Sequence, residues 1–234
     1  YAPPKSSVFA RKTGSNDVYL CNTMITVDNA PSNWLNKDLL DIKKNKIKSV
    51  EIKKNEKDPV TLSRAKPSDD LILLNIKETH KPITSLIDAT AKVGELLKLE
   101  SILSDSDAKD LKFLNTFTIK DFDGLIYEFK LTEGLAEKSN QHCVKIKASI
   151  DEAYVNDVSK KEDEKKDGIA KLSLDQAKLV AKEFNEKHEK WNYLLAGWVA
   201  KRFLKDSEEL SEPIKKEPTE KPGEKAQEEK TEEV

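Results

Sequence analysis

The sequence predicts an α+β fold: a mainly antiparallel sheet of short strands, two longer helices packed on it, and a disordered C-terminal tail. Three observations predict this fold. Short β-prone runs with alternating apolar and polar residues recur along the chain. Two stretches repeat apolar residues at helical spacing. From residue 206 onward the chain is rich in Glu, Lys and Pro, a composition that buries too little apolar surface to order itself. We expect the helices to cover one face of the sheet.

The clearest pair of strands lies between Phe113 and Leu131. Asp123-Gly124 is a strong hairpin-turn signal, because Gly adopts positive φ without a steric clash and Asp tolerates that region. One predicted face is mainly apolar and the other mainly polar, which is the pattern of a half-buried antiparallel pair. The first face carries Phe113, Asn115, Phe117, Ile119, Asp121, Leu125, Tyr127, Phe129 and Leu131.

Shorter strands precede this hairpin. Two prolines make residues 1–7 an extended lead-in, because proline excludes a helix there. A single helical turn is predicted over residues 29–36, with Asn29 as its N-cap. The predicted strands are residues 8–12 and 18–21, which form a hairpin, and residues 47–52, 59–63 and 70–76.

Pro82 predicts the start of the first helix, since proline suits the first helical position. Gly94 weakens this helix by about 1 kcal/mol relative to Ala. Short strands are then predicted at residues 99–103 and 143–150. The apolar stripe of the helix consists of Ile83, Leu86, Ile87, Thr90, Val93, Leu96 and Leu97.

Ser173 is the predicted N-cap of the second helix. We interpret residues 197–200 as a terminal strand and residues 156–168 as a charged, mobile linker. Residues 8–205 therefore form a single predicted domain, followed by a disordered charged tail over 206–234. The stripe of the second helix consists of Leu174, Ala177, Val180, Phe184, His188 and Trp191.

Composition excludes several classes of protein. Charged residues make up 36% of the chain and its net charge is -2, with Lys and Glu mixed throughout. A nucleic-acid binder would show a basic face with aromatic stacking platforms, so we expect no nucleic-acid partner. Seven glycines include no phosphate-binding loop, and we expect no cofactor. The longest apolar run is far shorter than the ~18–20 residues that cross a bilayer.

Cysteine and histidine give no metal site. Cys21 and Cys143 are the only cysteines, too few and too distant for a zinc knuckle or a Cys-x-x-Cys redox pair. A disulfide between them is an alternative, but the favoured interpretation is that both are buried small residues in strands and do not pair. The histidines lack metal-ligand spacing, and His188 on the apolar stripe is predicted to be a hydrogen-bonded packing residue.

Four residues are candidates for binding: Trp34, Asp121, Asp123 and Trp198. The two carboxylates lie close enough in sequence to act as an acid–base pair, but shaping the turn is the favoured interpretation. An EF-hand loop would need further oxygen ligands and a distal Glu, which are missing. The tryptophans are candidates for lining a groove, whereas packing at the edge of a small core is the favoured interpretation. No catalytic residue is identified.

Three separated motifs follow one another in the order of a known family. Residues 32–42 (SNWLNKDLLDI) and 47–52 (IKSVEI) place a Trp-Leu pair, a basic residue, Leu-Leu-Asp and a Val-Glu strand in succession. Residues 122–125 (FDGL) and Gly197-Trp198 follow. This arrangement resembles the bacterial family called domain of unknown function 4340, over about residues 8–204. The chain departs from it at residues 202–204 (RFL), where the family often has a Leu-Pro pair, and in its charged tail.

The resemblance implies a periplasmic fragment that normally follows one N-terminal membrane helix. Since the chain begins with Tyr1 rather than Met, we expect that an upstream segment has been removed, and the sequence in hand cannot show whether it held an anchor. It also implies a location on the periplasmic face of the bacterial inner membrane and a link to ABC-transporter components. The family has no established activity, so it supplies no catalytic residues.

The leading hypothesis is a non-enzymatic, membrane-tethered domain that binds a partner protein or envelope component. The alternative is an envelope polysaccharide-binding or hydrolysing module that uses Asp121 and Asp123. Paired carboxylates in such an enzyme lie ~5–9.5 Å apart across an open cleft. A third hypothesis is a scaffold whose charged tail recruits partners.

Overall fold

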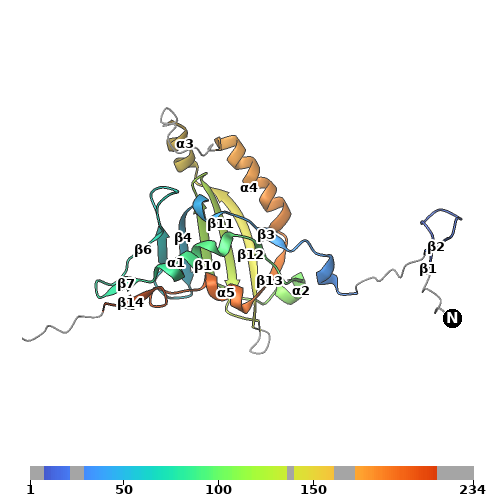
Figure 1. Ribbon diagram of the computed structural model, residues 1–234, viewed down its shortest axis with the longest axis horizontal. Coiled ribbons are helices and arrows are strands. Elements are labelled where there is room, and N and C mark those ends of the chain that lie inside the picture. Colours follow the sequence, from blue (N-terminus) through green and yellow to red (C-terminus); the bar gives the residue numbers. More distant parts are fainter. Residues whose placement is uncertain (1–7, 22–28, 136–139, 161–171, 215–234) are drawn as a thin grey trace, which may run out of the picture.

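The computed structural model describes residues 8–21, 29–135, 140–160 and 172–214. Its centre is an eight-stranded sheet in the order β6-β5-β4-β10-β11-β12-β13-β9, in which all neighbouring strands are antiparallel (Figure 1). This confirms the predicted α+β class. The strands are β4 (Ile47–Lys54), β5 (Val60–Ser63), β6 (Ile72–Leu74), β9 (Ser101–Leu103), β10 (Phe113–Asp121), β11 (Leu125–Thr132), β12 (Gln141–Ile150) and β13 (Asn192–Ala196).

The predicted central hairpin is correct in its turn and in its buried face. β10 and β11 pair with Phe117 opposite Phe129 and Ile119 opposite Tyr127. Every second residue is buried from Asn115 to Asp121 and from Leu125 to Leu131, as the alternation predicts, whereas Phe113 is only half-buried. Phe117 and Phe129 are fully buried and contact each other edge-on, with ring centroids 6.0 Å apart. The hairpin is therefore the middle of the hydrophobic core.

The helices pack on this apolar face of the sheet. Helix α5 (Gly197–Phe203) inserts Phe203 against Phe117, with ring centroids 4.7 Å apart. Helix α4 (Leu174–His188) places Phe184 against Tyr127 of β11 at 5.2 Å. Ser173 is the N-cap of α4, as predicted, and forms a capping box with Gln176. His188 is buried, with a 2.8 Å hydrogen bond between its Nδ1 and the Tyr193 hydroxyl. The remaining helices are α1 (Thr84–Ala91), α2 (Asp105–Ala108), α3 (Glu152–Lys160) and the 3₁₀ turns η1 (Pro31–Trp34), η2 (Lys44–Lys46) and η3 (Lys92–Gly94).

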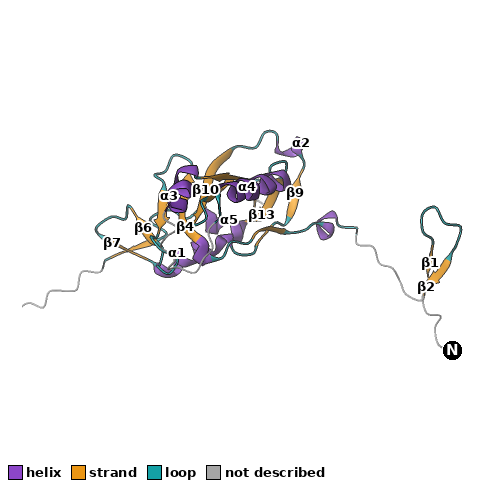
Figure 2. Cartoon of the chain, turned by 90° about the horizontal axis from the view of Figure 1, so that it is seen from above, coloured by secondary structure: helices purple, strands orange, loops and turns teal. Residues whose placement is uncertain are grey.

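Three two-stranded sheets complete the described chain. They are β1 (Val8–Ala10) with β2 (Tyr19–Cys21), β3 (Asp38–Leu40) with β8 (Leu97–Lys98), and β7 (His80–Pro82) with β14 (Ser211–Pro213). The first is the predicted N-terminal hairpin. Viewed from above, β6 and β7 lie at one end of the main sheet, and β9 and α2 at the other (Figure 2).

The prediction that Pro82 starts the first helix is wrong. Pro82 ends strand β7, where it pairs with Ser211, and α1 begins two residues later. The helix also ends earlier than the apolar stripe suggests, because η3 follows it and Leu96 then adopts a left-handed φ of 50°. Asn29 is not a cap either: the N-cap position of η1 is Ala30, without a side-chain hydrogen bond.

The predicted terminal strand over residues 197–200 is wrong, because these residues start helix α5. The strand is the preceding run, Asn192–Ala196, whose five residues are all buried. Gly197 permits the switch from strand to helix. A Cβ on it would lie 2.3 Å from the carbonyl oxygen of Asn140, so only glycine lets the two chain segments approach this closely.

The predicted boundary of the tail at residue 206 is also wrong. Leu210 is fully buried, and its carbonyl accepts a 2.9 Å hydrogen bond from the backbone N–H of Ile83. Strand β14 then pairs with β7. The first part of the predicted linker, 156–160, is helical in α3. Residues 1–7, 161–168 and 215–234 lie outside the described residues, as do the predictions made for them.

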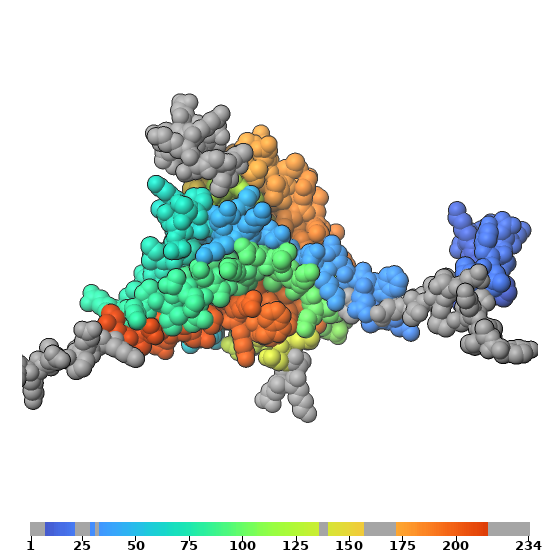
Figure 3. Space-filling model, in the orientation of Figure 1, coloured from blue at the N-terminus to red at the C-terminus, as the bar shows by residue number. Residues whose placement is uncertain are grey.

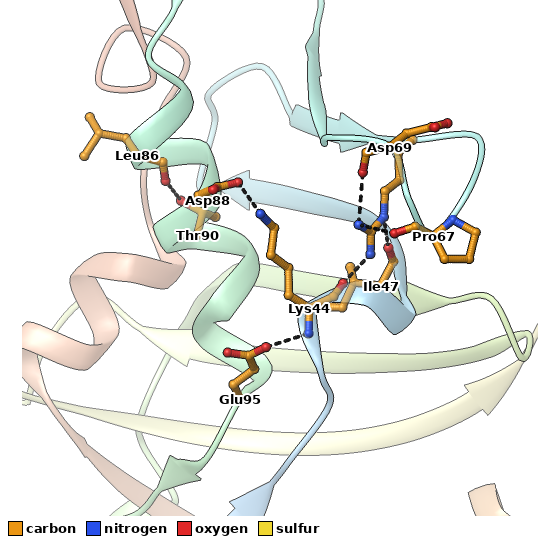
Figure 4. A network of polar contacts seen from close by, with 9 residues as sticks. Lys44, Ile47, Pro67, Asp69, Leu86, Asp88, Thr90 and Glu95 are labelled. Atoms are coloured by element: carbon orange, nitrogen blue, oxygen red, sulfur yellow. Dashed lines mark hydrogen bonds and ion pairs between the residues drawn. The ribbon is translucent and has the colours of Figure 1, made fainter. Parts of the chain in front are cut away.

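A buried arginine joins the loops beside the sheet. Arg64 is 6% exposed and donates to four backbone carbonyls: Nε to Ile47 (2.6 Å), Nη1 to Pro67 and Asp69 (3.2 Å each), and Nη2 to Lys44. Figure 4 shows this network and its continuation to α1, where the Lys44 ammonium reaches Asp88 at 2.6 Å. One side chain thus joins the segment of residues 44–47 to the loop of residues 67–69 through hydrogen bonds to their carbonyls.

Both cysteines are free thiols, as the favoured interpretation had it. Cys143 is fully buried in β12, and burial raises its pKa to about 11. Among the residues that the structure describes, no helix combines the length and apolar character needed to cross a membrane.

Candidate functional site

Asp121 and Asp123 both lie at the turn between β10 and β11, where Asp121 shapes the turn. Asp121 is 4% exposed, and its Oδ1 accepts hydrogen bonds from the backbone N–H groups of Asp123 (3.0 Å) and Leu125 (2.8 Å). Asp123 is also buried, and its Oδ2 lies 3.3 Å from the Lys46 ammonium. Gly124 supplies the positive φ, 85°, that the turn requires.

The surroundings of Asp121 shift its protonation. Burial raises the pKa of this carboxyl to about 7, and the negative charge of Asp123 adds to the effect, whereas the two amide hydrogen bonds oppose it. A cavity of about 170 Å³ lies beside Asp121, lined also by Lys48 and Lys120 but not by Asp123. The two carboxylates therefore do not face each other across this cavity, and the geometry favours the turn-shaping interpretation over the acid–base one.

The tryptophans are not core residues, so the favoured interpretation of them is wrong. Trp34, Trp191 and Trp198 are 69%, 48% and 62% exposed. Trp34 lies in η1. Trp198 lies in the first turn of α5 and lines a groove. The structure therefore places the four predicted binding residues in three regions: Asp121 and Asp123 at the turn between β10 and β11, Trp34 in η1, and Trp198 at a groove.

The groove, which we call the Trp198 groove, has a cavity volume of about 250 Å³ and lies between residues 92–100 and α5. Figure 3 shows the two segments side by side on the surface. Two larger hollows, of about 520 and 400 Å³, are lined mainly by charged side chains. The Trp198 groove differs from them because its floor is apolar: Val93, Leu97 and Leu99 are each 4% exposed.

The rim of the groove carries two large apolar side chains in contact with solvent. Leu96 is 68% exposed and Trp198 is 62% exposed. The guanidinium of Arg202, one turn further along α5, lies 5.1 Å from the centre of the Trp198 ring. Exposed Trp and Arg beside an apolar cavity are the residue types that dominate the energetics of protein–protein interfaces.

Leu96 is held in a conformation that leucine rarely adopts. Its φ of 50° lies in the left-handed region, which costs roughly 1–2 kcal/mol for a residue with a Cβ. Neighbouring contacts keep it there: the Leu96 N–H donates to Asp41 Oδ1 at 3.4 Å, and Glu95 Oε1 accepts from the Lys44 N–H at 2.6 Å. Strain of this kind concentrates at functional sites.

Replacing Leu96 with asparagine is expected to stabilise the fold by about 0.5–1 kcal/mol, since asparagine tolerates positive φ and Leu96 buries little surface. The melting temperature should rise by about 1–4 °C in thermal unfolding. Leu179→Asn is the matched control, because Leu179 is also exposed but lies within helix α4. That change should destabilise, since asparagine is a poorer helix former. Equal losses of stability in the two variants would contradict the strain at Leu96.

Two residues of the groove were missed from the sequence. Leu96 was assigned to the stripe of the first helix, although Gly94 is a signal that could have ended that helix earlier. Arg202 carries no sequence signal of its own. It reaches Trp198 only because residues 197–203 are helical, which brings positions four apart to one face.

No set of three or more His, Cys, Asp or Glu side chains in the described part of the chain is arranged to hold a metal ion. Fold and site together define an α+β protein with an antiparallel sheet, helices on one face and an open apolar groove beside α5. The profile of one family, described as Domain of unknown function (DUF4340), matches residues 2–121. The chain belongs to this family. The comparisons gave no match among curated proteins and none among solved structures.

The family match explains part of the resemblance. It covers β1 to β10, and so it includes the Trp-Leu motif around Trp34 and the Val-Glu strand β4. Gly197-Trp198 lies outside the matched residues. Helix α5 continues from Gly197 through Phe203, which is fully buried against the central hairpin.

Proposed function

We propose that the protein is a non-enzymatic binding module whose Trp198 groove receives a segment of a partner protein. The observation that carries this proposal is the pair of exposed apolar side chains, Leu96 and Trp198, above an apolar floor. A large exposed apolar side chain next to a cavity gains free energy when a partner removes it from water, about 25 cal/mol per Å² of apolar surface.

The proposal for the place of action is supported only by the resemblance described in the sequence analysis. We propose that the module works on the periplasmic face of the bacterial inner membrane, and that its partners include ABC-transporter components. The resemblance supports both points. A topology reporter fused after residue 214 in the intact gene product tests the location: activity of a periplasmic reporter is expected, and activity of a cytoplasmic reporter would overturn it.

Site-specific photo-crosslinking in the native cells tests the groove. A photoreactive phenylalanine analogue replaces Trp198, and in a matched variant it replaces Trp191, which is also exposed but lies outside the groove. We expect one discrete adduct with another polypeptide from position 198, absent from position 191 and abolished by Leu96→Asp. Identical adducts from both positions, or none from position 198, would refute the groove as the binding site.

The tail hypothesis is tested by a different deletion from the one that the sequence suggests. Residues 206–214 belong to the fold, because Leu210 is buried and β14 pairs with β7. Removing them would unfold that edge and confuse loss of structure with loss of recruitment. A chain ending at Ile214 keeps these contacts. Loss of the position-198 adduct in that shortened chain would assign recruitment to the tail instead of the groove.

A further inference from the structure

The Trp198 groove is lined by more cationic than anionic side chains. Its lining contains three cations, Lys92, Lys98 and Arg202, and two carboxylates, Glu95 and Glu100. Both carboxylates already bind groups of this chain. Glu95 Oε1 accepts the Lys44 N–H at 2.6 Å, and Glu100 Oε2 accepts the Gln141 side-chain amide at 2.6 Å.

The cations have fewer partners. Lys98 pairs with Asp38 at 3.4 Å, but both side chains are more than 60% exposed, and such pairs contribute only ~0–1 kcal/mol. Among the described residues, no carboxylate lies within 4.0 Å of the Lys92 ammonium or the Arg202 guanidinium. Two cationic groups at the groove thus keep hydrogen-bond donors that the described fold does not use.

Arg202 is also oriented for a carboxylate. Its guanidinium lies against the Trp198 ring, 5.1 Å from the ring centre, which restricts the side chain. A planar guanidinium donates two parallel hydrogen bonds to a carboxylate, and less rotational freedom is lost when its orientation is already restricted. An apolar side chain entering the groove beside Trp198 would bring a neighbouring carboxylate within reach of this group.

Resting on the proposed function, we propose that the groove recognises a peptide segment in which a large apolar residue stands next to Asp or Glu. The apolar residue would pack on Val93 and Leu97 between Leu96 and Trp198, and the carboxylate would bind Arg202 and Lys92. Charge complementarity of this kind contributes more to the specificity for a partner than to the affinity. A neutral or basic segment would leave the two cations unpaired.

Selection from a random peptide library displayed on phage tests the proposal with the full chain as bait. We expect enrichment of an aromatic or aliphatic residue adjacent to Asp or Glu. A selected peptide, synthesised with a fluorophore, then reports affinity by polarisation. Trp198→Ala should weaken binding at least ~30-fold, the loss typical of an interface hot spot of about 2 kcal/mol.

The charge variants separate the inference from the function on which it rests. Lys92→Gln with Arg202→Gln should weaken binding about 3- to 10-fold, the sum of two exposed charge pairs. The control, Lys201→Gln with Lys109→Gln, removes the same charge at exposed positions outside the groove and should change affinity less than ~2-fold.

Three other outcomes would contradict the acidic preference, the binding function or the peptide as occupant. Peptides without acidic residues that still depend on Trp198 would overturn the acidic preference and leave the binding function standing. Peptides that bind Trp198→Ala as tightly as the unaltered chain would overturn the function itself. A dimer in sedimentation that Trp198→Ala dissociates would place a second copy in the groove and overturn the peptide proposal.

Discussion

Replacing Arg64 with methionine is expected to lower the free energy of unfolding by about 3–5 kcal/mol, because hydrogen bonds from a charged donor contribute about 1.5–3 kcal/mol each and four are lost. The net loss is smaller than the sum of the four hydrogen bonds, because the variant no longer has to remove a charged guanidinium from water on folding. The four carbonyls belong to residues 44, 47, 67 and 69, so both loops should loosen together. Urea unfolding followed by circular dichroism measures the change.

Two further variants test the origin of this stability. Arg64→Lys keeps the charge but has no planar fork, so we expect an intermediate loss of about 2–3 kcal/mol. Lys44→Ala removes the 2.6 Å ion pair with Asp88 in the same loop and leaves the Lys44 carbonyl in place. It should cost no more than about 1 kcal/mol. Equal losses for Lys44→Ala and Arg64→Met would refute the carbonyl network as the source.

Asp121→Asn is expected to remove a pH-dependent cost. The folded pKa of Asp121 is raised to about 7 from 3.8, so between these values the folded state holds a proton that the unfolded state has lost. Stability therefore falls as pH rises from about 4 to 7 and levels off above 7. At 1.36 kcal/mol per pH unit, the unaltered protein should lose roughly 2–3 kcal/mol relative to Asp121→Asn between pH 5 and pH 8.

The measured quantity is the difference in free energy of unfolding between the unaltered protein and Asp121→Asn at each pH, because other groups titrate in the same pH range. Burial lowers the folded pKa of His188 to about 4, so its contribution is lost as pH falls from about 6.5 to 4, the opposite direction. Subtracting the two urea curves at each pH cancels His188, which is present in both proteins. A difference that stays constant from pH 5 to pH 8 would show that Asp121 is ionised throughout.

The candidate site shows where local sequence reasoning ends. Trp198 was selected as a candidate, but as part of a strand, in which Arg202 would not lie beside it. The apolar run Asn192–Ala196 and the segment after it look alike by composition. They differ in tertiary contacts: the first pairs with β12 and β9, and Asn140, far away in sequence, leaves no room for a Cβ at Gly197, where the helix begins. Propensity at such a boundary is weaker than tertiary packing, which decides the outcome.

By itself, the sequence determined the central hairpin, its buried face, the capped helix α4 and the packing role of His188. These features follow from alternation, turn chemistry and caps, which act over a few residues. Only the tertiary structure decided that Leu210 and β14 belong to the fold, that Arg64 joins two loops, and that Leu96 and Trp198 share a groove. Each of these depends on contacts between segments distant in the chain, and a local pattern holds no information about them.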